Sequence, residues 1–189
     1  MRLFVAVDVP DALRDAIESE VVELLRPQLP EARWTRPEGR HLTLKFLGEV
    51  PAERTADVAE ALREAACGHP PFRTAFATLG GFPSMRRPRV LWVGIGEGAD
   101  AMAGVAADVD AALEPLGFAR EKRPFAAHLT LARFKVPKPV GDLPAVLVPA
   151  KGFTAAEVVL VRSQLHPKGA RYTEVARFPL RGSATSTPG

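Results

Sequence analysis

The sequence has a single cysteine, Cys67, among 189 residues, so no disulfide can form within the chain. It also lacks any apolar run close to the roughly 18 to 20 residues that a membrane-spanning helix needs. The N-terminal segment has one basic residue, a short apolar run and then a proline and acids, which is unlike a cleavable signal. These absences argue against a secreted, disulfide-bonded or membrane-spanning protein and favour the reducing cytoplasm.

The composition is that of an ordinary globular protein. Hydrophobic residues make up 47% of the chain and charged residues 25%. The net charge of +3 and the pI near 9.3 give a mild bias towards anionic partners. We expect one domain over residues 1–180. The tail 181–189 is polar and rich in small residues, so we expect it to be disordered.

One pattern occurs twice. The chain reads HLTLKFLG over 41–48 and HLTLARFK over 128–135, and the same offset of 87 residues separates Arg2-Leu-Phe-Val-Ala from Arg89-Val-Leu-Trp-Val. Apolar residues at helical spacing between strand and motif also repeat, namely Ile17, Val21 and Leu25 against Val105, Val109 and Leu113. The sequence therefore predicts an α+β fold with a bilobal, pseudo-twofold duplication. Two antiparallel sheets would flank a central cleft, with the helices outside.

The remaining elements follow from apolar periodicity and from glycine and proline positions. We expect a helix from Leu13 to Pro27 and another over 52–67. Strands are predicted over 2–9, 72–79, 89–95, 153–163 and 171–178, and the last two would form a hairpin through the turn 166–169.

Strand alternation predicts which side chains of the repeated motif share a face. His41 and Thr43 should lie on one face, with Leu42, Leu44 and Phe46 on the other, and the second motif should follow the same rule. A single histidine in a strand is more often a half-buried structural residue than a catalytic one. Two histidines at matched positions of a repeat favour a catalytic role.

Two facing imidazoles suit acid–base chemistry, because imidazole titrates near neutral pH and one ring can donate a proton while the other accepts one. The predicted proton donor and acceptor are His41 and His128, with the order of roles left open by the pattern alone. Threonine hydroxyls at 43 and 130 are short donors suited to phosphoryl oxygens. A mononuclear zinc site would need three or four ligands, and neither motif has a third at suitable spacing. We therefore predict a phosphodiester site without metal or other cofactor.

Two basic residues are further candidates for phosphate binding. Arg133 follows the second motif, although strict alternation places it on the face opposite His128 unless a bulge redirects it. Lys45 should share the face of His41, with a solvated surface lysine as the alternative. Phe82 and Phe125 could stack on a base, but aromatics near strand ends more often belong to the core.

Other motifs are weaker. The segment Gly94–Ala99 fits the dinucleotide fingerprint, but the acid at the required spacing, Glu114, lies in a helical pattern, so we interpret the segment as a turn. His69 and His166 lack a neighbouring His-x-Thr pattern and are best interpreted as loop histidines.

The two motifs resemble the paired His-x-Thr-x signatures of the two-histidine (2H) phosphoesterase superfamily. The flanks WTRPEGRHLTLKFLGEV, GGFP, PRVLWVGI and RPFAAHLTLARF are similar to its RNA 2′,3′-cyclic phosphodiesterase branch, also called 2′-5′ RNA ligase-like. The resemblance runs from the first strand to about Tyr172. It departs at Ala127, where the family often has proline.

The resemblance implies a metal-free opening of RNA 2′,3′-cyclic phosphate ends to 2′-phosphomonoesters. It assigns His41 as proton donor to the 3′-oxygen, His128 as the base that activates water, and Thr43 and Thr130 as phosphate contacts. RNA ends or nucleotides carrying the cyclic phosphate would be the partners, with no membrane and no obligate protein partner. Two other functions stay open, namely RNA end ligation by the reverse chemistry and an RNA-end or nucleotide-binding module without turnover.

Overall fold

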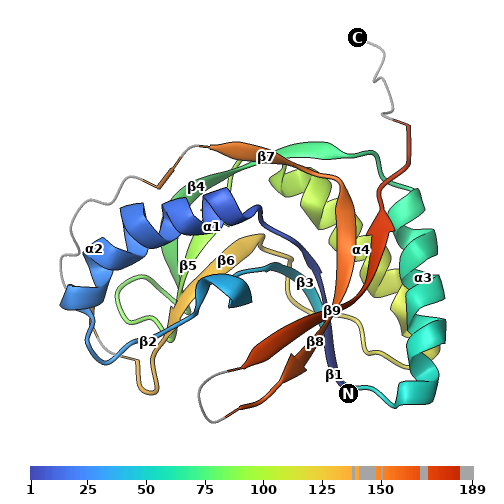
Figure 1. Ribbon diagram of the computed structural model, residues 1–189, viewed down its shortest axis with the longest axis horizontal. Coiled ribbons are helices and arrows are strands. Elements are labelled where there is room, and N and C mark those ends of the chain that lie inside the picture. The colour runs from blue at the N-terminus through green and yellow to red at the C-terminus, as the bar shows by residue number, and fades with distance from the viewer. Residues whose placement is uncertain (138, 141–147, 150, 167–169, 184–189) are drawn as a thin grey trace.

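The computed structural model describes residues 1–137, 139–140, 148–149, 151–166 and 170–183 (Figure 1). The strands are β1 (Arg2–Val7), β2 (Arg33–Trp34), β3 (Leu42–Glu49), β4 (Phe72–Phe82), β5 (Val90–Ile95), β6 (His128–Arg133), β7 (Gly152–Ala155), β8 (Glu157–Gln164) and β9 (Arg171–Pro179). The α-helices are α1 (Asp11–Ile17), α2 (Glu23–Leu25), α3 (Thr55–Cys67) and α4 (Ala99–Leu113). Residues 184–189 of the predicted tail and 167–169 of the predicted hairpin turn lie outside the described residues.

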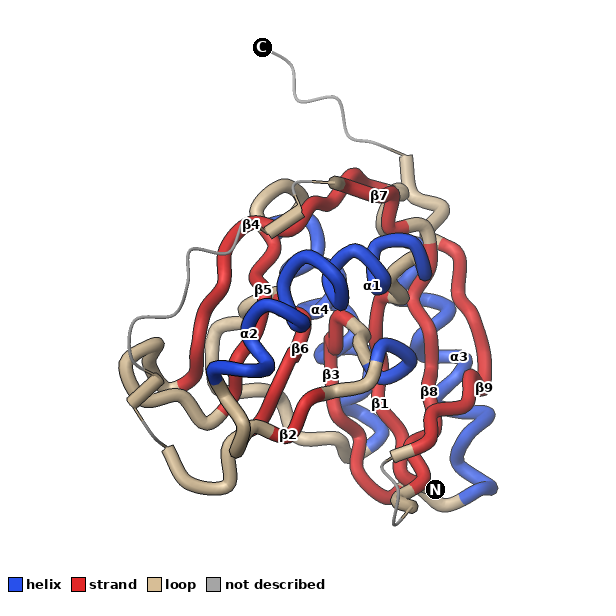
Figure 2. Tube along the Cα trace, turned by 60° about the vertical axis from the view of Figure 1, so that its left-hand side comes forward, coloured by secondary structure: helices blue, strands red, loops and turns tan. Residues whose placement is uncertain are grey.

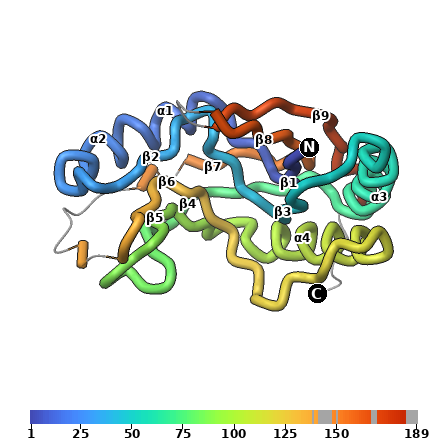
Figure 3. Tube along the Cα trace, turned by 90° about the horizontal axis from the view of Figure 1, so that it is seen from below, coloured from blue at the N-terminus to red at the C-terminus, as the bar shows by residue number. Residues whose placement is uncertain are grey.

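The predicted helices are confirmed. A π-helical turn over Glu18–Val22 joins α1 to α2, and a 3₁₀ turn over Arg26–Gln28 continues to Pro27. Proline cannot supply the next backbone N–H, which explains the change of geometry there. The apolar stripes of α1 and α4 are buried, as their spacing predicted. Helices α1 and α2 lie along one side of the molecule, and α3 and α4 along another (Figure 3).

The strands form one curled antiparallel sheet in the order β7-β4-β5-β6-β3-β1-β8-β9, with β2 added beside β6 (Figure 2). The prediction of two separate sheets is therefore wrong. The two halves of the strand order are joined at one residue pair, Leu42 of β3 opposite Leu129 of β6. The join is short because the chain before Leu42 turns away through a 3₁₀ turn at Pro37–Gly39 and the end of β6 pairs with β2 instead.

The strand predicted over 153–163 is two strands that belong to different parts of the sheet. Strand β7 pairs with β4, whereas β8 pairs with β1 and β9. The break falls at Ala156, whose carbonyl accepts a hydrogen bond from the Leu180 N–H (2.8 Å). Apolar periodicity continues through the break because both strands are buried, so the pattern alone could not show it.

The core has two parts of unequal size. The main cluster takes the buried faces of α1, α3 and α4 together with Leu3, Val5 and Val7 of β1. Phe4 and Ala6, which alternate with these residues, form a second small cluster with Val159 and Val161 on the other face of the sheet. Among the described residues, no helix has the length and apolarity to span a bilayer.

Candidate active site

The pairing of Leu42 with Leu129 brings the two repeated motifs side by side. Both leucines are buried in the main core. Their neighbours His41, Thr43, His128 and Thr130 are only partly buried, and they alternate with the leucines, so they lie towards the other face of the sheet. Because the strands are antiparallel, Thr43 lies at the His128 end of the pair and Thr130 at the His41 end.

Each motif is followed by a bulge at the same position. The register of β3 against β1 shifts between Thr43 and Lys45, and that of β6 against β5 shifts between Thr130 and Ala132. A bulge inserts one residue and reverses which side chains face which way beyond it. The residue five places after each histidine, Phe46 or Arg133, therefore returns to the histidine face, and both are exposed.

The bulges correct three sequence predictions, of which the first is the placement of Phe46 on the face opposite His41. Strict alternation placed Lys45 on the His41 face, but its side chain is buried and binds Asp110 of α4 and the carbonyl of Ala119 (2.7 Å). Lys45 therefore holds α4 against β3 and its ammonium group is not directed to the site. Arg133, by contrast, lies on the same side as His128.

His41 precedes β3 and is held by residues on both sides. Arg40 is fully buried, and its guanidinium binds Glu18 and donates to the carbonyls of Arg14 (3.2 Å) and Thr35 (3.1 Å). These bonds fix the backbone just before the histidine. The Arg40 and Arg26 guanidiniums outweigh burial and hold the pKa of Glu18 below its usual value.

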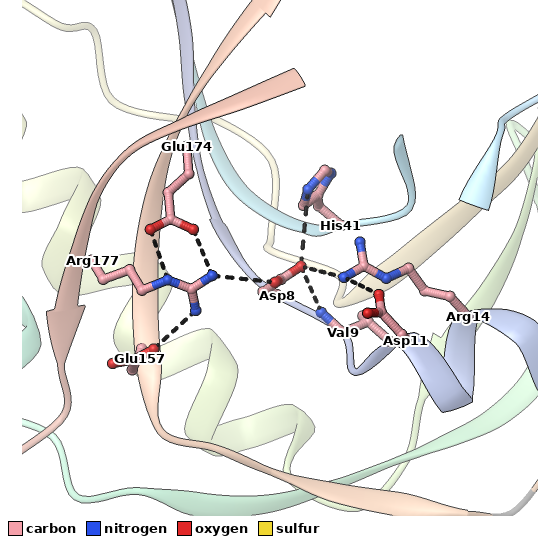
Figure 4. A network of polar contacts seen from close by, with 8 residues as sticks. All are labelled: Asp8, Val9, Asp11, Arg14, His41, Glu157, Glu174 and Arg177. Atoms are coloured by element: carbon pink, nitrogen blue, oxygen red, sulfur yellow. Dashed lines mark hydrogen bonds and ion pairs between the residues drawn. The ribbon is translucent and has the colours of Figure 1, made fainter. Parts of the chain in front are cut away.

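The His41 ring sits among aromatic and charged groups. The rings of Phe4 and Tyr172 each lie 5.5 Å from it in edge-on geometry. Its Nε2 is 3.9 Å from Oδ1 of Asp8, at the end of β1 (Figure 4). Burial lowers the pKa of His41, and Arg14 lowers it further. Asp8 and the Gly39 backbone oppose them, and the net pKa stays below the usual value.

Asp8 joins His41 to two arginines. Its carboxylate lies 3.3 Å from Arg14 of α1 and 3.8 Å from Arg177 of β9, and it accepts a hydrogen bond from the Val9 N–H (3.0 Å). The guanidiniums are themselves neutralised by other acids, Asp11 for Arg14 and both Glu157 and Glu174 for Arg177 (Figure 4). Asp8 is thus a fixed negative charge beside the His41 ring.

The His128 ring has aromatic neighbours but no carboxylate among its described ion-pair partners. Phe82 lies 5.1 Å away and Trp92 6.1 Å away, centroid to centroid. Gly80 makes room for this cluster, because a Cβ there would overlap the Trp92 ring. Phe125, the other aromatic candidate, packs against the main core.

The hydrogen bond of His128 sets its tautomer. Its Nδ1 lies 2.7 Å from the carbonyl oxygen of Ala126, which can only accept, so Nδ1 carries the proton. Burial lowers the pKa of His128, the Ala126 carbonyl raises it and Arg133 lowers it, with a net decrease. The neutral ring is therefore favoured, with the lone pair on Nε2, which is the arrangement of a base.

Two residues at the site were missed by sequence reasoning. Asp8 was predicted only as part of the strand over 2–9, although a lone acid near the end of an apolar strand is a usable signal. Tyr172 lies far from His41 in sequence and no local pattern connects them. Elsewhere, His69 pairs with Asp108 (2.8 Å), and Gly98 takes a positive φ of 79° at the turn before α4. In the described part of the chain, no group of three or more His, Cys, Asp or Glu side chains could hold a metal ion.

Comparison with known proteins gives consistent matches. The family model described as LigT like phosphoesterase matches residues 7–92 and again residues 93–172. An RNA 2′,3′-cyclic phosphodiesterase of Archaeoglobus fulgidus is 38% identical over 94% of this chain and 99% of its own length. One of Geobacillus stearothermophilus is 35% identical over 98% of this chain, which spans only 59% of that relative. The crystal structure of E. coli LigT complexed with 3′-AMP is 26% identical, with a TM-score of 0.81 over 95% of this chain and 97% of that one.

Proposed function

Because the chain belongs to the LigT-like phosphoesterase family, we propose that it hydrolyses RNA 2′,3′-cyclic phosphate ends to 2′-phosphomonoesters. The observation that carries the proposal is the unequal charge around two equivalent histidines. Each ring has an arginine charge near it, Arg14 for His41 and Arg133 for His128, but only His41 has a described carboxylate to oppose that charge, with Asp8 3.9 Å from Nε2. This asymmetry supports a donor and an acceptor rather than two identical groups.

In the proposed reaction, the neutral Nε2 of His128 takes a proton from water as the water oxygen bonds to phosphorus. The bond from phosphorus to the 3′-oxygen breaks, and protonated His41 gives its proton to that oxygen. One water is consumed, and the products are a 3′-hydroxyl and a 2′-phosphate. Asp8 favours the charged form of His41 that this step needs.

The threonines supply hydroxyl donors. Thr43 and Thr130 lie on the histidine face at opposite ends of the Leu42–Leu129 pair, which suits donation to the two non-bridging oxygens of one phosphate. Arg133 is proposed as an additional cationic contact, supported by its position on the His128 face beyond the bulge. No step in this scheme requires a metal ion, since protons move between ring nitrogens, water and the leaving oxygen.

We also propose that the domain arose by duplication, with the histidines facing a shared cleft within one unit over 1–180. Two family-model matches in tandem support duplication. So does the strand order, in which β6 and β5 stand on one side of the central join as β3 and β1 stand on the other. A cytoplasmic location remains the expectation from the single cysteine.

The direct test is incubation with 2′,3′-cyclic AMP in the presence of a chelator, followed by separation of the 2′- and 3′-phosphate isomers. The proposal predicts 2′-AMP at an undiminished rate. A 3′-phosphate product, or turnover that a specific metal restores after chelation, would contradict it. Binding without turnover would favour the nucleotide-binding alternative, and joining to an RNA with a 5′-hydroxyl would favour ligation.

A further inference from the structure

A pair of arginines on the histidine face has no carboxylate partner among the residues that the structure describes. The register of β2 against β6 places Arg33 directly opposite Arg133. Directly opposite residues of an antiparallel pair point to the same face. The next pair along, Trp34 opposite Ala132, lies towards the main core, so Arg33 and Arg133 lie on the other face, and both are exposed.

This placement is unfavourable unless an anion is nearby. Like charges directly opposite one another weaken a sheet, and neither guanidinium forms an ion pair with a carboxylate anywhere in the described ranges. The arginines around His41 are neutralised by carboxylates, as Arg14, Arg40 and Arg177 show. Two uncompensated, forked donors side by side are suited to a phosphate group.

A second cationic feature lies next to this pair. The β4–β5 connection forms a cavity of about 350 Å³ lined by Ser84, Arg86, Arg87 and Pro139. Both arginines are exposed, and no ion pair links either to another described residue.

The connection is anchored beside Arg133. It leaves the sheet after Phe82 and returns at Val90, and Val90 pairs with both Phe82 and Arg133. The Arg89 N–H closes it by donating to the Phe82 carbonyl (2.6 Å). Figures 1 and 3 show it at the same end of the molecule as β2 and the end of β6. The Phe82 ring also contacts His128, so the connection borders the histidine face.

We propose that Arg33, Arg133, Arg86 and Arg87 form a binding site for backbone phosphates of an RNA strand whose cyclic end lies at the histidines. This rests on the proposed function and deepens it, because it makes a strand, rather than a mononucleotide, the preferred substrate. A cyclic mononucleotide carries no further phosphodiester, so these arginines add nothing to its binding. A longer strand is bound at phosphates beyond the reacting one as well.

The test compares two substrates and two variants. The substrates are 2′,3′-cyclic AMP and a short oligoribonucleotide ending in a 2′,3′-cyclic phosphate. The test variant is Arg33→Gln/Arg86→Gln/Arg87→Gln, which leaves Arg133 in place because it lies close to His128. The control is Arg2→Gln/Arg63→Gln/Lys151→Gln, which removes the same charge from exposed positions on other elements.

The wild type should turn over the oligonucleotide with the higher kcat/KM. In the test variant that value should fall about tenfold or more, with turnover of the mononucleotide within about twofold of wild type. The control should change neither. Binding of 2′-phosphate-ended RNA, followed against salt, should show a slope smaller by about 0.7 for each phosphate that the variant no longer neutralises.

Two results would overturn the subsite, namely no loss on the oligonucleotide in the test variant or a loss of equal size on both substrates. Failure of the proposed function looks different, since the wild type would then hydrolyse neither substrate. The salt slope of RNA binding would still test the arginines in that case. A salt slope equal to that of the wild type would contradict the subsite in that case as well.

Discussion

The two histidine regions are alike in backbone and unlike in charge. Both present a histidine at the start of a strand, a threonine two residues on, a bulge after it and two aromatic rings beside the imidazole. Of the two rings, only His41 has a carboxylate within ion-pair distance among the described residues. The Nδ1–H of His128 donates to the Ala126 carbonyl at 2.7 Å. The two strands therefore hold the two imidazole rings in equivalent positions. Contacts from distant segments of the chain make the surroundings of the two rings different.

Removing either ring should have the largest effect. His41→Ala and His128→Ala should each lower kcat about 10²-fold or more. The double variant should lose much less than the product of the two, because the residues act as a unit. His69→Ala, at the histidine paired with Asp108, is the matched control. Steady-state rates with melting curves check this, and a folded His128→Ala protein with near wild-type turnover would refute it.

Removing the Asp8 carboxylate should make the charge around His41 more like that around His128. In Asp8→Asn, His41 loses the negative charge that raises its pKa, while burial and Arg14 still lower it, so its pKa should fall further. Since the donor must be protonated, activity is lost as pH rises through that pKa, and the alkaline limb should move to lower pH. The rate at neutral pH should fall about tenfold.

Asp57→Asn is the control for that experiment, because Asp57 is an exposed carboxylate of α3 that belongs to none of the described contacts of His41 or Arg14. Its profile should match wild type. A pH–rate series for both variants separates an electrostatic role of Asp8 from a structural one. If the two variants behave alike, Asp8 does not hold the proton on His41.

The wild-type pH profile should be bell-shaped, with its optimum on the acid side of the usual imidazole pKa. Both histidines have pKa values lowered by burial. Because His128 must be neutral to accept a proton, the rate falls as pH falls through its pKa. Because His41 must be charged to donate one, the rate falls as pH rises through its pKa. An optimum well above neutral pH would show that burial does not dominate at these rings.

The threonines should matter equally in the two regions, and less than the histidines. Thr43→Ala and Thr130→Ala each remove one hydroxyl donor aimed at the phosphate, with an expected loss of about tenfold in kcat. Thr→Ser at each position keeps the hydroxyl and serves as the control. A loss confined to one threonine would show that the phosphate lies nearer one strand than the other.

Lys45 distinguishes the two regions structurally, since the equivalent residue in the second is Ala132. Lys45→Met should leave turnover nearly unchanged and lower the free energy of unfolding by about 1–3 kcal/mol, because Asp110 loses its buried partner and keeps only Arg120 and the Glu121 N–H. Arg63→Met, at the exposed pair with Glu60, should cost less than about 1 kcal/mol. Urea unfolding compares them, and a large rate loss in Lys45→Met would return this residue to the site.

Apolar periodicity predicted the helices, most strands and the face on which each His-x-Thr pair lies, because it reports directly which face is buried. It could not predict the bulges. The extra residue in each is a leucine, Leu44 or Leu131, and a buried leucine fits the apolar pattern equally well with or without a bulge. The faces of Lys45 and Arg133 were consequently reversed. It also could not join Asp8, Arg177 and Tyr172 to His41, as these contacts depend on how β1 and β9 are placed by the sheet.

The central claim is that His41 donates the proton to the leaving oxygen and His128 does not. A 2′,3′-cyclic phosphate analogue with sulfur in place of the bridging 3′-oxygen tests it most directly, because a thiolate leaves without needing a proton. The rates of His41→Ala and His128→Ala on this analogue are the measurement. The account predicts that His41→Ala recovers most of the wild-type rate and His128→Ala stays slow. Recovery by His128→Ala instead, or by neither variant, would contradict it.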